Sequence, residues 1–238
     1  MTRRYFSEAP IASAAATLDG PEAHHLLHVL RATAGTAVTL FDGSGAEFEA
    51  EVIACRRSSV ELRVLHRRQV DRELPFSLTL GVPLPKGDRQ RWIVEKAVEL
   101  GVTRLVPLVT QRSAAASEKH SASKLRRYVI EASKQCGRNR LMEIATPAEW
   151  ADWLRLAERS ADGRLRKWIA HPGRPPLLAA EVGGAKPSYV AVGPEGGLAD
   201  EEIAAAEAEG WTMIGLGPRI LRIETAAFGL VAMLALPR

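Results

Sequence analysis

Two glycine-rich segments near the C-terminal end of the chain carry residues that could do chemistry. The first runs from Gly193 to Gly197 and the second from Leu216 to Ala226. Each follows a short apolar run and precedes a stretch with a helical pattern. Ligands in open α/β sheets bind beyond the carboxyl ends of the strands. This layout therefore predicts a small-molecule site built from two loops.

The first segment is a poor candidate for a phosphate site. It has no Lys, Ser or Thr in the Walker pattern and no G-x-G-x-x-G spacing. It does hold a carboxylate, Glu195, which would repel phosphate and favour a ligand with positive charge, such as a sulfonium or an amino group. A phosphate-binding nucleotidyl enzyme is therefore disfavoured. A tight turn that needs only the backbone freedom of glycine also explains these residues.

The second segment places Arg222 and Glu224 on either side of Ile223, at the start of a very apolar helix. An acidic residue in the first turn of a helix suits the helix dipole, so a cap with a surface salt bridge is one interpretation. The other is an arginine that orients a substrate, with a polar group near the reacting atom. Both interpretations remain open at this point.

Composition and charge narrow the class of protein. The 238 residues are 46% hydrophobic and 25% charged, as in ordinary globular proteins. Residues 84–140 hold thirteen Lys and Arg against five Asp and Glu, a local charge of +8, which indicates either a polyanion-binding surface or a solvated helical face. Cys55 and Cys136 form no metal-ligand spacing, and isolated thiols suit a reducing cytosol. The sequence also predicts no signal peptide and no membrane span, so we expect a cytoplasmic protein without a metal.

The pattern of elements changes style near residue 72. Before it, a helix is predicted over 21–31, followed by strands over 36–41, 47–53 and 59–65, the first two joined by an Asp-Gly turn. A polar stretch, 66–73, is interpreted as a linker. These features predict a small barrel or curved sheet over residues 1–72.

Residues 73–238 alternate between strands and helices, which predicts a parallel sheet covered on both faces. Asp88 is expected to cap the first helix, which ends at Gly101. The predicted strands are 76–82, 105–109, 168–170, 189–192 and 213–216, and the other predicted helices are 119–136, 147–159, 201–208 and 225–236.

The chain also resembles a known family. The two C-terminal loops, in this order and spacing, are similar to those of the SPOUT superfamily of S-adenosylmethionine-dependent RNA methyltransferases. Within this superfamily, the chain resembles the bacterial 16S ribosomal RNA uracil-N3 methyltransferases. The motifs that carry this resemblance are 3–6 (RRYF), 24–31 (HHLLHVLR), 40–45 (LFDGSG), 85–88 (PKGD), 95–102 (EKAVELGV), 111–113 (QRS) and 135–138 (QCGR).

The resemblance implies an α/β fold: a PUA-like β-barrel over 1–72, then a SPOUT-type parallel sheet over 73–238 with a C-terminal trefoil knot. Knots are rare, and topology rules alone would argue against one. It also implies that S-adenosyl-L-methionine is bound by the two loops and by a third after residue 170. The implied cofactor-binding residues are Ala170, His171, Gly193, Glu195, Gly196, Gly197, Leu216, Gly217, Ile220, Leu221 and Thr225.

The implied reaction is methylation of N3 of a uridine in 16S rRNA, free or in the small ribosomal subunit, by a homodimer. Loss of the N3 proton needs a base or a group that stabilises the anion, and we expect Arg222 and Glu224 to serve as catalytic residues. Expected RNA contacts are Arg3, Arg4, Arg31, Lys86, Arg112, Arg126, Lys134, Gln135 and Arg138. His24, His25 and His28 could contact RNA or only pack. The alternative function is an RNA-binding protein of the same fold without catalysis.

Overall fold

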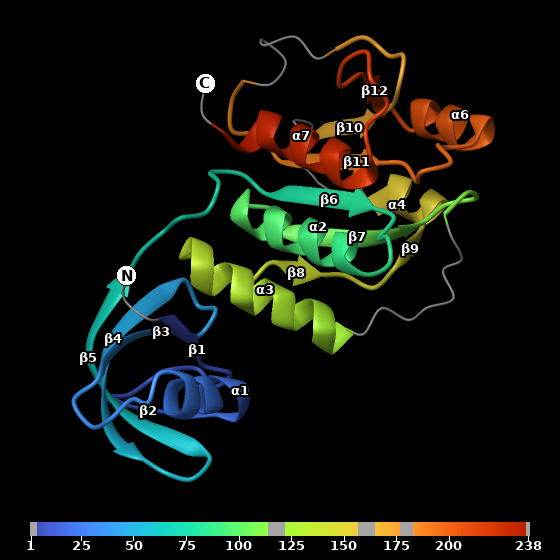
Figure 1. Cartoon of the computed structure of the whole chain (residues 1–238). Helices are drawn as coiled ribbons and strands as arrows, with labels where there is room; N and C mark the ends of the chain where they lie inside the picture. Colours follow the sequence, from blue (N-terminus) through green and yellow to red (C-terminus); the bar gives the residue numbers. More distant parts are fainter. Residues whose placement is uncertain (1–3, 114–121, 157–164, 177–182, 237–238) are drawn as a thin grey trace. The chain divides into compact units, whose positions relative to one another are not determined.

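The computed structural model describes residues 4–113, 122–156, 165–176 and 183–236 (Figure 1). The chain divides into two compact units. The first comprises residues 1–73 and 130–141, and the second comprises residues 74–129 and 142–238. The expected boundary at residue 72 remains a prediction. Within the described residues, no helix is long and apolar enough to cross a membrane.

The first unit is built on a curved five-stranded sheet, and the sequence predicts such a sheet (Figure 1). Asp42 shapes the predicted turn, because its carboxylate accepts the backbone N–H of Ser44 (3.0 Å) and of Ile11 (2.9 Å). Strand β1 pairs with β3 in parallel, and the other pairs are antiparallel. In spatial order the strands are β1 (Arg4–Phe6), β3 (Ala37–Phe41), β4 (Ala46–Cys55), β5 (Ser59–Gln69) and β2 (Ala15–Asp19).

Two expectations for this unit are wrong. The helix predicted over 21–31 is a short α1 (Gly20–His24) followed by a π-helical turn, η1 (His25–Val29), in which Leu30 N–H bonds to the His25 carbonyl at 3.1 Å. The polar stretch after residue 65 is not all linker, because β5 continues to Gln69. Its side chains there are exposed, while its backbone pairs with β4 as far as Ala46, so polarity alone concealed the strand.

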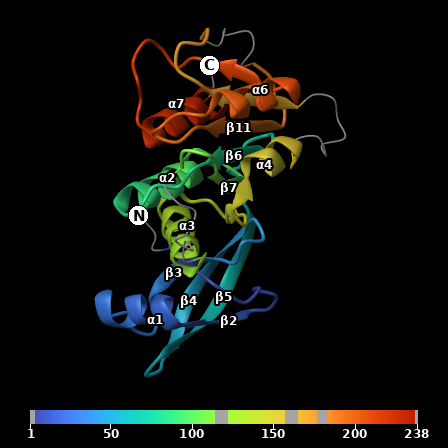
Figure 2. The ribbon, with the colours of Figure 1, turned by 90° about the vertical axis from the view of Figure 1, so that its right-hand side faces the viewer.

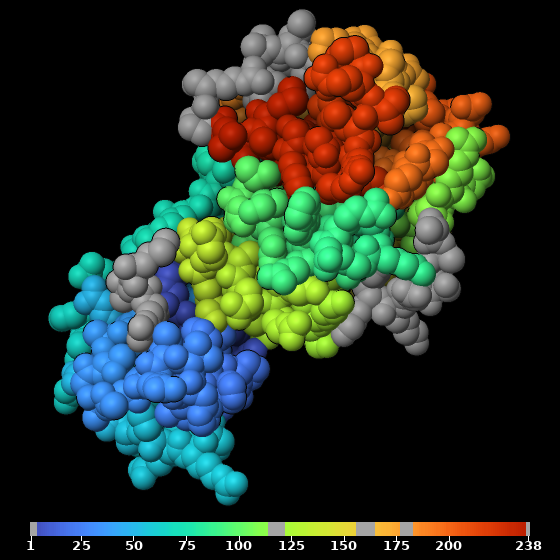
Figure 3. Space-filling model, in the orientation of Figure 1, coloured from blue at the N-terminus to red at the C-terminus, as the bar shows by residue number. Residues whose placement is uncertain are grey.

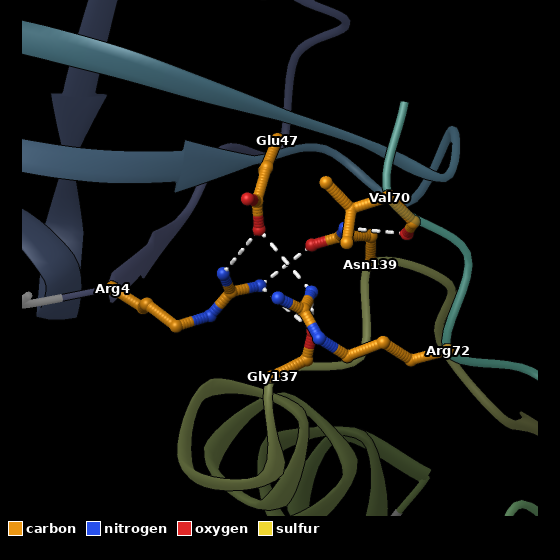
Figure 4. A network of polar contacts seen from close by, with 6 residues as sticks. All are labelled: Arg4, Glu47, Val70, Arg72, Gly137 and Asn139. Atoms are coloured by element: carbon orange, nitrogen blue, oxygen red, sulfur yellow. Dashed lines mark hydrogen bonds and ion pairs between the residues drawn. The ribbon is translucent and has the colours of Figure 1, made fainter. Parts of the chain in front are cut away.

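A polar network holds the segment after residue 130 in the first unit (Figure 4). Nη1 of Arg4 donates to Oε2 of Glu47 (2.9 Å), and Nη2 donates to Oδ1 of Asn139 (2.6 Å) and to the Gly137 carbonyl (3.2 Å). Arg72 donates to the same Glu47 oxygen (3.3 Å) and to the Gly137 carbonyl (2.9 Å). Burial raises the pKa of Glu47, but the hydrogen bonds from Arg4 and Arg72 outweigh it and hold that pKa below its ordinary value.

The second unit contains a parallel sheet in the order β12-β10-β11-β6-β7-β8. Helices α2 and α7 contact each other, and α7 packs on β6 and β11; α4 contacts α6 and β7 (Figure 2). The strands are β6 (Leu78–Val82), β7 (Arg104–Val109), β8 (Glu143–Ile144), β10 (Arg166–Ala170), β11 (Ser188–Val192) and β12 (Thr212–Ile214), while β9 (Ala148–Glu149) pairs with β7. The helices are α2 (Asp88–Glu99), α4 (Trp150–Leu156), α6 (Asp200–Ala208) and α7 (Ile223–Ala235). Helix α3 (Ala122–Cys136) begins in this unit and ends in the first.

The core of this unit is aromatic. The fully buried ring of Trp153 lies 5.5 Å from that of Trp211 and 5.7 Å from that of Tyr189. A Cβ on Gly81 would lie 2.8 Å from the Trp153 ring, so β6 needs a glycine there. This packing fixes β6 and β11 beside each other, and β11 leads into the first glycine-rich loop.

The alternation of strands and helices in this unit is confirmed, with three local differences. The first helix has Gly87 rather than Asp88 as its N-cap, and Asp88 lies in the first turn. The helix predicted from residue 147 begins at Trp150, because Ala148 and Glu149 extend along β7; its predicted end, 157–159, lies outside the described residues. Strand β8 was not predicted. The trefoil knot remains a prediction.

The Glu47 network generates a stability prediction. Glu47→Gln removes a carboxylate that accepts from two guanidiniums and is only 16% exposed, so we expect a loss of about 1–3 kcal/mol in the first unit at neutral pH. Because the folded-state pKa is lowered, this stability is present above the ordinary pKa and is lost as the pH falls through the folded value. The difference between wild type and variant should therefore shrink as the pH falls through the folded-state pKa of Glu47.

Hydrogen exchange of peptides from β3 and β4 measures this loss. The matched control is Glu49→Gln, whose carboxylate pairs with one exposed arginine, Arg68, and is itself 41% exposed. Equal effects of the two substitutions at neutral pH would contradict the assignment.

Candidate functional site

A cavity of about 270 Å³ lies where three neighbouring strands of the second unit end. The loops after β10, β11 and β12 all contribute to it, because parallel neighbours end at the same edge of a sheet. The start of α7 supplies Ile223 and Ala226. The strand ends contribute Ala170 and Val192, and the loop residues that line it are His171, Pro172, Gly193, Pro194, Glu195, Gly196, Gly197, Leu198, Leu216, Gly217, Arg219, Ile220 and Leu221.

The structure thus brings together all the residues that the resemblance assigns to the cofactor, except Thr225, which does not line the cavity. Two glycines serve the backbone directly. Gly197 has φ +72° and Gly217 has φ +102°, both in the left-handed region that favours glycine. Their binding role remains a prediction.

Two arginines from other elements fix the first glycine-rich loop. Nη1 of Arg89, on α2, pairs with Oε1 of Glu195 at 2.9 Å. This ion pair offsets the negative charge that favoured a cationic ligand in the sequence. Nη1 of Arg112 donates to the carbonyls of Gly196 (3.2 Å) and Leu198 (3.5 Å). The loop is therefore bound both through the side chain of Glu195 and through the backbone carbonyls of Gly196 and Leu198.

A buried carboxylate, Glu202, holds the base of the same loop. It is only 8% exposed. Its Oε2 accepts the N–H of Ala199 at the start of α6 (2.8 Å), and its Oε1 accepts the N–H of Gln111 after β7 (2.9 Å). The second bond positions the residue next to Arg112. An acidic residue three positions after the N-cap is a local sequence signal for the bond to Ala199, but no local signal indicates the bond to Gln111.

The two expected catalytic residues lie at the start of α7. Arg222 is the N-cap residue and is exposed, whereas Glu224 lies in the first turn and is 5% exposed. Neither lines the cavity, although their neighbours Leu221 and Ile223 do. Among the described residues, Oε2 of Glu224 has no hydrogen-bond partner. A buried carboxylate oxygen without a partner is unusual in a purely structural residue.

The expected RNA contacts fall into three groups. Arg3 lies outside the described residues. Three others are largely buried and form ion pairs. Arg4, whose side chain is 14% exposed, pairs with Glu47. Lys134 (14% exposed) pairs with Glu22 and Glu131, and Arg138 (5% exposed) pairs with Glu73. The remaining residues are exposed, namely Arg31, Lys86, Arg112, Arg126 and Gln135.

Burial of the Glu22 carboxylate raises its pKa, although the charge of Lys134 and its hydrogen bond act to lower that pKa. Lys134 also lies over the ring of Tyr5, 5.6 Å from its centre. In the described part of the chain, no group of three or more His, Cys, Asp or Glu is placed to hold a metal.

Comparisons with known proteins agree with this arrangement. Residues 72–235 match the family model of an RNA methyltransferase domain, and residues 18–65 match an RNA methyltransferase PUA domain. The chain is 27% identical to "Ribosomal RNA small subunit methyltransferase E" of Bacillus subtilis, over 95% of this chain and 90% of that protein. It is 31% identical to the protein of the same name in Synechocystis, over 91% and 71% of the two chains.

Solved structures are similar over the whole chain. A putative methyltransferase from Legionella pneumophila, in complex with the cofactor SAM, has a TM-score of 0.88 and 31% identity, covering 98% of this chain and 97% of that one. Ribosomal RNA small subunit methyltransferase E from Neisseria gonorrhoeae, bound to S-adenosyl methionine, has a TM-score of 0.84 and 29% identity, covering 98% and 96%. Since the methyltransferase model spans most of the described residues, this chain belongs to the RNA methyltransferase family.

Proposed function

We propose that this chain transfers a methyl group from S-adenosyl-L-methionine to N3 of a uridine in 16S ribosomal RNA. The observation that carries the proposal is the cavity at the ends of β10, β11 and β12, in a chain whose full-length relatives are ribosomal RNA methyltransferases. Two similar structures are described with this cofactor bound. Because its substrate would be ribosomal RNA, we place the protein in the cytoplasm.

The residues at the cavity fit such a cofactor. Leu198, Leu216, Ile220, Leu221 and Ile223 supply apolar surface for an adenine ring, and the glycines leave backbone groups close to the ligand. When bound, the cofactor supplies a methyl group on a sulfonium, which is a strong electrophile. Arg89 and Arg112 bind the first loop through the Glu195 carboxylate and the Gly196 carbonyl, and such contacts would reduce the entropy lost when a ligand binds.

The uracil imide must lose its N3 proton during the reaction. We assign the stabilisation of negative charge on a uracil carbonyl oxygen to Arg222, which is exposed beside the cavity-lining residue Leu221. We assign Glu224, whose Oε2 is buried without a partner among the described residues, to acceptance of the proton or to the orientation of Arg222. N3 lies on the Watson–Crick edge, so the target base must be unpaired or extruded.

We further propose that the protein works as a homodimer through the surface of α2 and α7. These two helices lie side by side on the face shown in Figure 3. Each leaves one large apolar side chain exposed: Trp92 on α2 is 58% exposed, and Leu236, directly after α7, is 58% exposed. Burial of such side chains against a second chain would be favourable. We assign the phosphate contacts to the exposed cations Arg31, Lys86, Arg112 and Arg126.

The dimer is tested by sedimentation velocity. The wild-type chain should sediment as a dimer, and Trp92→Glu should shift it towards the monomer, because the substitution would bury a charge without a partner. Leu65→Glu is the matched control, since Leu65 is also exposed, at 47%, but lies on β5 in the first unit. A wild-type monomer at all concentrations would contradict the proposal.

The reaction is tested by transfer of labelled methyl groups to 16S rRNA, together with calorimetric titration of the cofactor. Arg222→Ala should lower turnover about 100-fold or more, in line with the loss of an oxyanion-stabilising donor, and leave the cofactor Kd unchanged. Arg174→Ala, an exposed arginine paired with Glu207, is the matched control and should keep normal turnover. Near-normal turnover of Arg222→Ala would overturn its assignment. A chain that binds RNA but not the cofactor would instead be a binding protein without catalysis.

Glu202 should affect cofactor binding rather than turnover. Glu202→Gln can accept only one of its two backbone N–H groups and would turn an amide NH₂ towards the other, so the cofactor Kd should rise about tenfold. The neighbouring exposed Glu201→Gln controls for the loss of charge. Circular dichroism must show both variants folded. An unchanged Kd for Glu202→Gln would show that the loop does not depend on this carboxylate.

A further inference from the structure

A second cavity, of about 230 Å³, lies in the first unit and is not used by the proposed reaction. It opens between the Asp42–Gly45 turn, the end of β5 and the loop after α3. Among its lining residues, Val70 is apolar and Gly45 has no side chain. The others are polar or charged, namely Gln69, Asp71, Glu73, Asn139 and Arg140. All of these residues belong to the same compact unit.

The floor of this cavity is preorganised. Asn139 is 2% exposed, accepts from Arg4 (2.6 Å) and donates to the Val70 carbonyl (3.1 Å), as Figure 4 shows. Its own carbonyl accepts the N–H of Gly45 at 3.3 Å. Because every one of these bonds joins different segments, the two walls of the cavity are held at a fixed separation.

The charged groups are arranged in a balanced way. Glu73 is neutralised by Arg138, which donates to it from Nε at 3.0 Å and from Nη2. Asp71 accepts the N–H of Glu73 at 2.9 Å and forms no ion pair with any described residue. The Arg140 guanidinium is exposed and likewise has no hydrogen bond or ion pair within the described chain. It lies over Gly45, where a Cβ would approach its Nη2 to 3.1 Å.

This balance selects the class of ligand. Two carboxylates in a small cavity disfavour a phosphate, and one open cation disfavours a free amine. An uncharged ligand with both donors and acceptors fits best, and a nucleobase is such a ligand. Guanine matches the two open groups: its N1–H and N2–H can donate to a carboxylate, while O6 and N7 accept from an arginine. Uracil has only one donor, and adenine would turn an amino group towards the arginine.

We propose that this cavity binds a guanine base of single-stranded RNA, with Asp71 on its donor edge and Arg140 on its acceptor edge. The assignment of the ligand to RNA rests on the proposed function, which makes ribosomal RNA the substrate. The base bound here is not the methylated one, because the proposed reaction methylates a uridine and this cavity would bind a guanine.

Fluorescence anisotropy with labelled pentaribonucleotides tests this directly. Three probes carry guanosine, inosine or adenosine as the central residue between uridines. The wild-type chain should bind the guanosine probe about tenfold more tightly than the adenosine probe, with inosine, which lacks N2, between them. Arg140→Ala and Asp71→Asn should each abolish this preference. Arg57→Ala, an exposed arginine in the same unit that does not line the cavity, should keep it.

Equal affinity of the wild type for the guanosine and adenosine probes, or a preference retained in both variants, would overturn the proposal. Competition by free guanosine monophosphate as effective as that of the guanosine probe would overturn the assignment to RNA in favour of a nucleotide site. Cofactor titration distinguishes failure of the guanine proposal from failure of the proposed function. Loss of the guanine preference with cofactor binding intact concerns this cavity alone, whereas a chain that prefers guanosine but transfers no methyl group fails only in its catalysis.

Discussion

Taking a carboxylate out of water costs free energy unless hydrogen bonds replace the water, and Glu202 gains two such bonds from backbone N–H groups in different segments. One segment follows β7 and carries Arg112; the other begins α6 and closes the first glycine-rich loop. The bond to Gln111 places Arg112 where it can bind the carbonyls of Gly196 and Leu198. The shape of the cavity therefore depends on the hydrogen bonds of Glu202, a residue that does not itself line the cavity.

The sheet supplies the other half of this arrangement. β12, β10 and β11 are adjacent and parallel, so their three loops meet at one edge although they are far apart in the sequence. Gly215 shows how closely the segments approach, since a Cβ there would lie 2.0 Å from the Arg174 carbonyl. A side chain at position 215 would therefore force these two segments apart.

Much of the fold could be predicted from sequence because its signals are local. The Asp-Gly turn, the run of β4 that follows it and the short apolar strands of the second unit depend on neighbouring residues. Two of the errors have long-range causes: the end of β5 is strand because β4 reaches Ala46, and Ala148 is strand because it lies along β7. The layout of the two glycine-rich loops predicted a small-molecule site, and the resemblance added the third loop and the identity of the ligand. Arg89 and Glu202 were missed, because the partners that give them a role are 106 and 91 positions away.

The central claim is that the cavity serves methylation of one uridine at N3. Mass mapping of the modified bases in 16S rRNA, incubated with the protein and S-adenosyl-L-methionine and compared with rRNA incubated without the protein, tests it most directly. A single uridine should gain one methyl group, and its nucleoside should be 3-methyluridine. A methyl group on the ribose, on C5 or on another base, or no added methyl group at all, would contradict it.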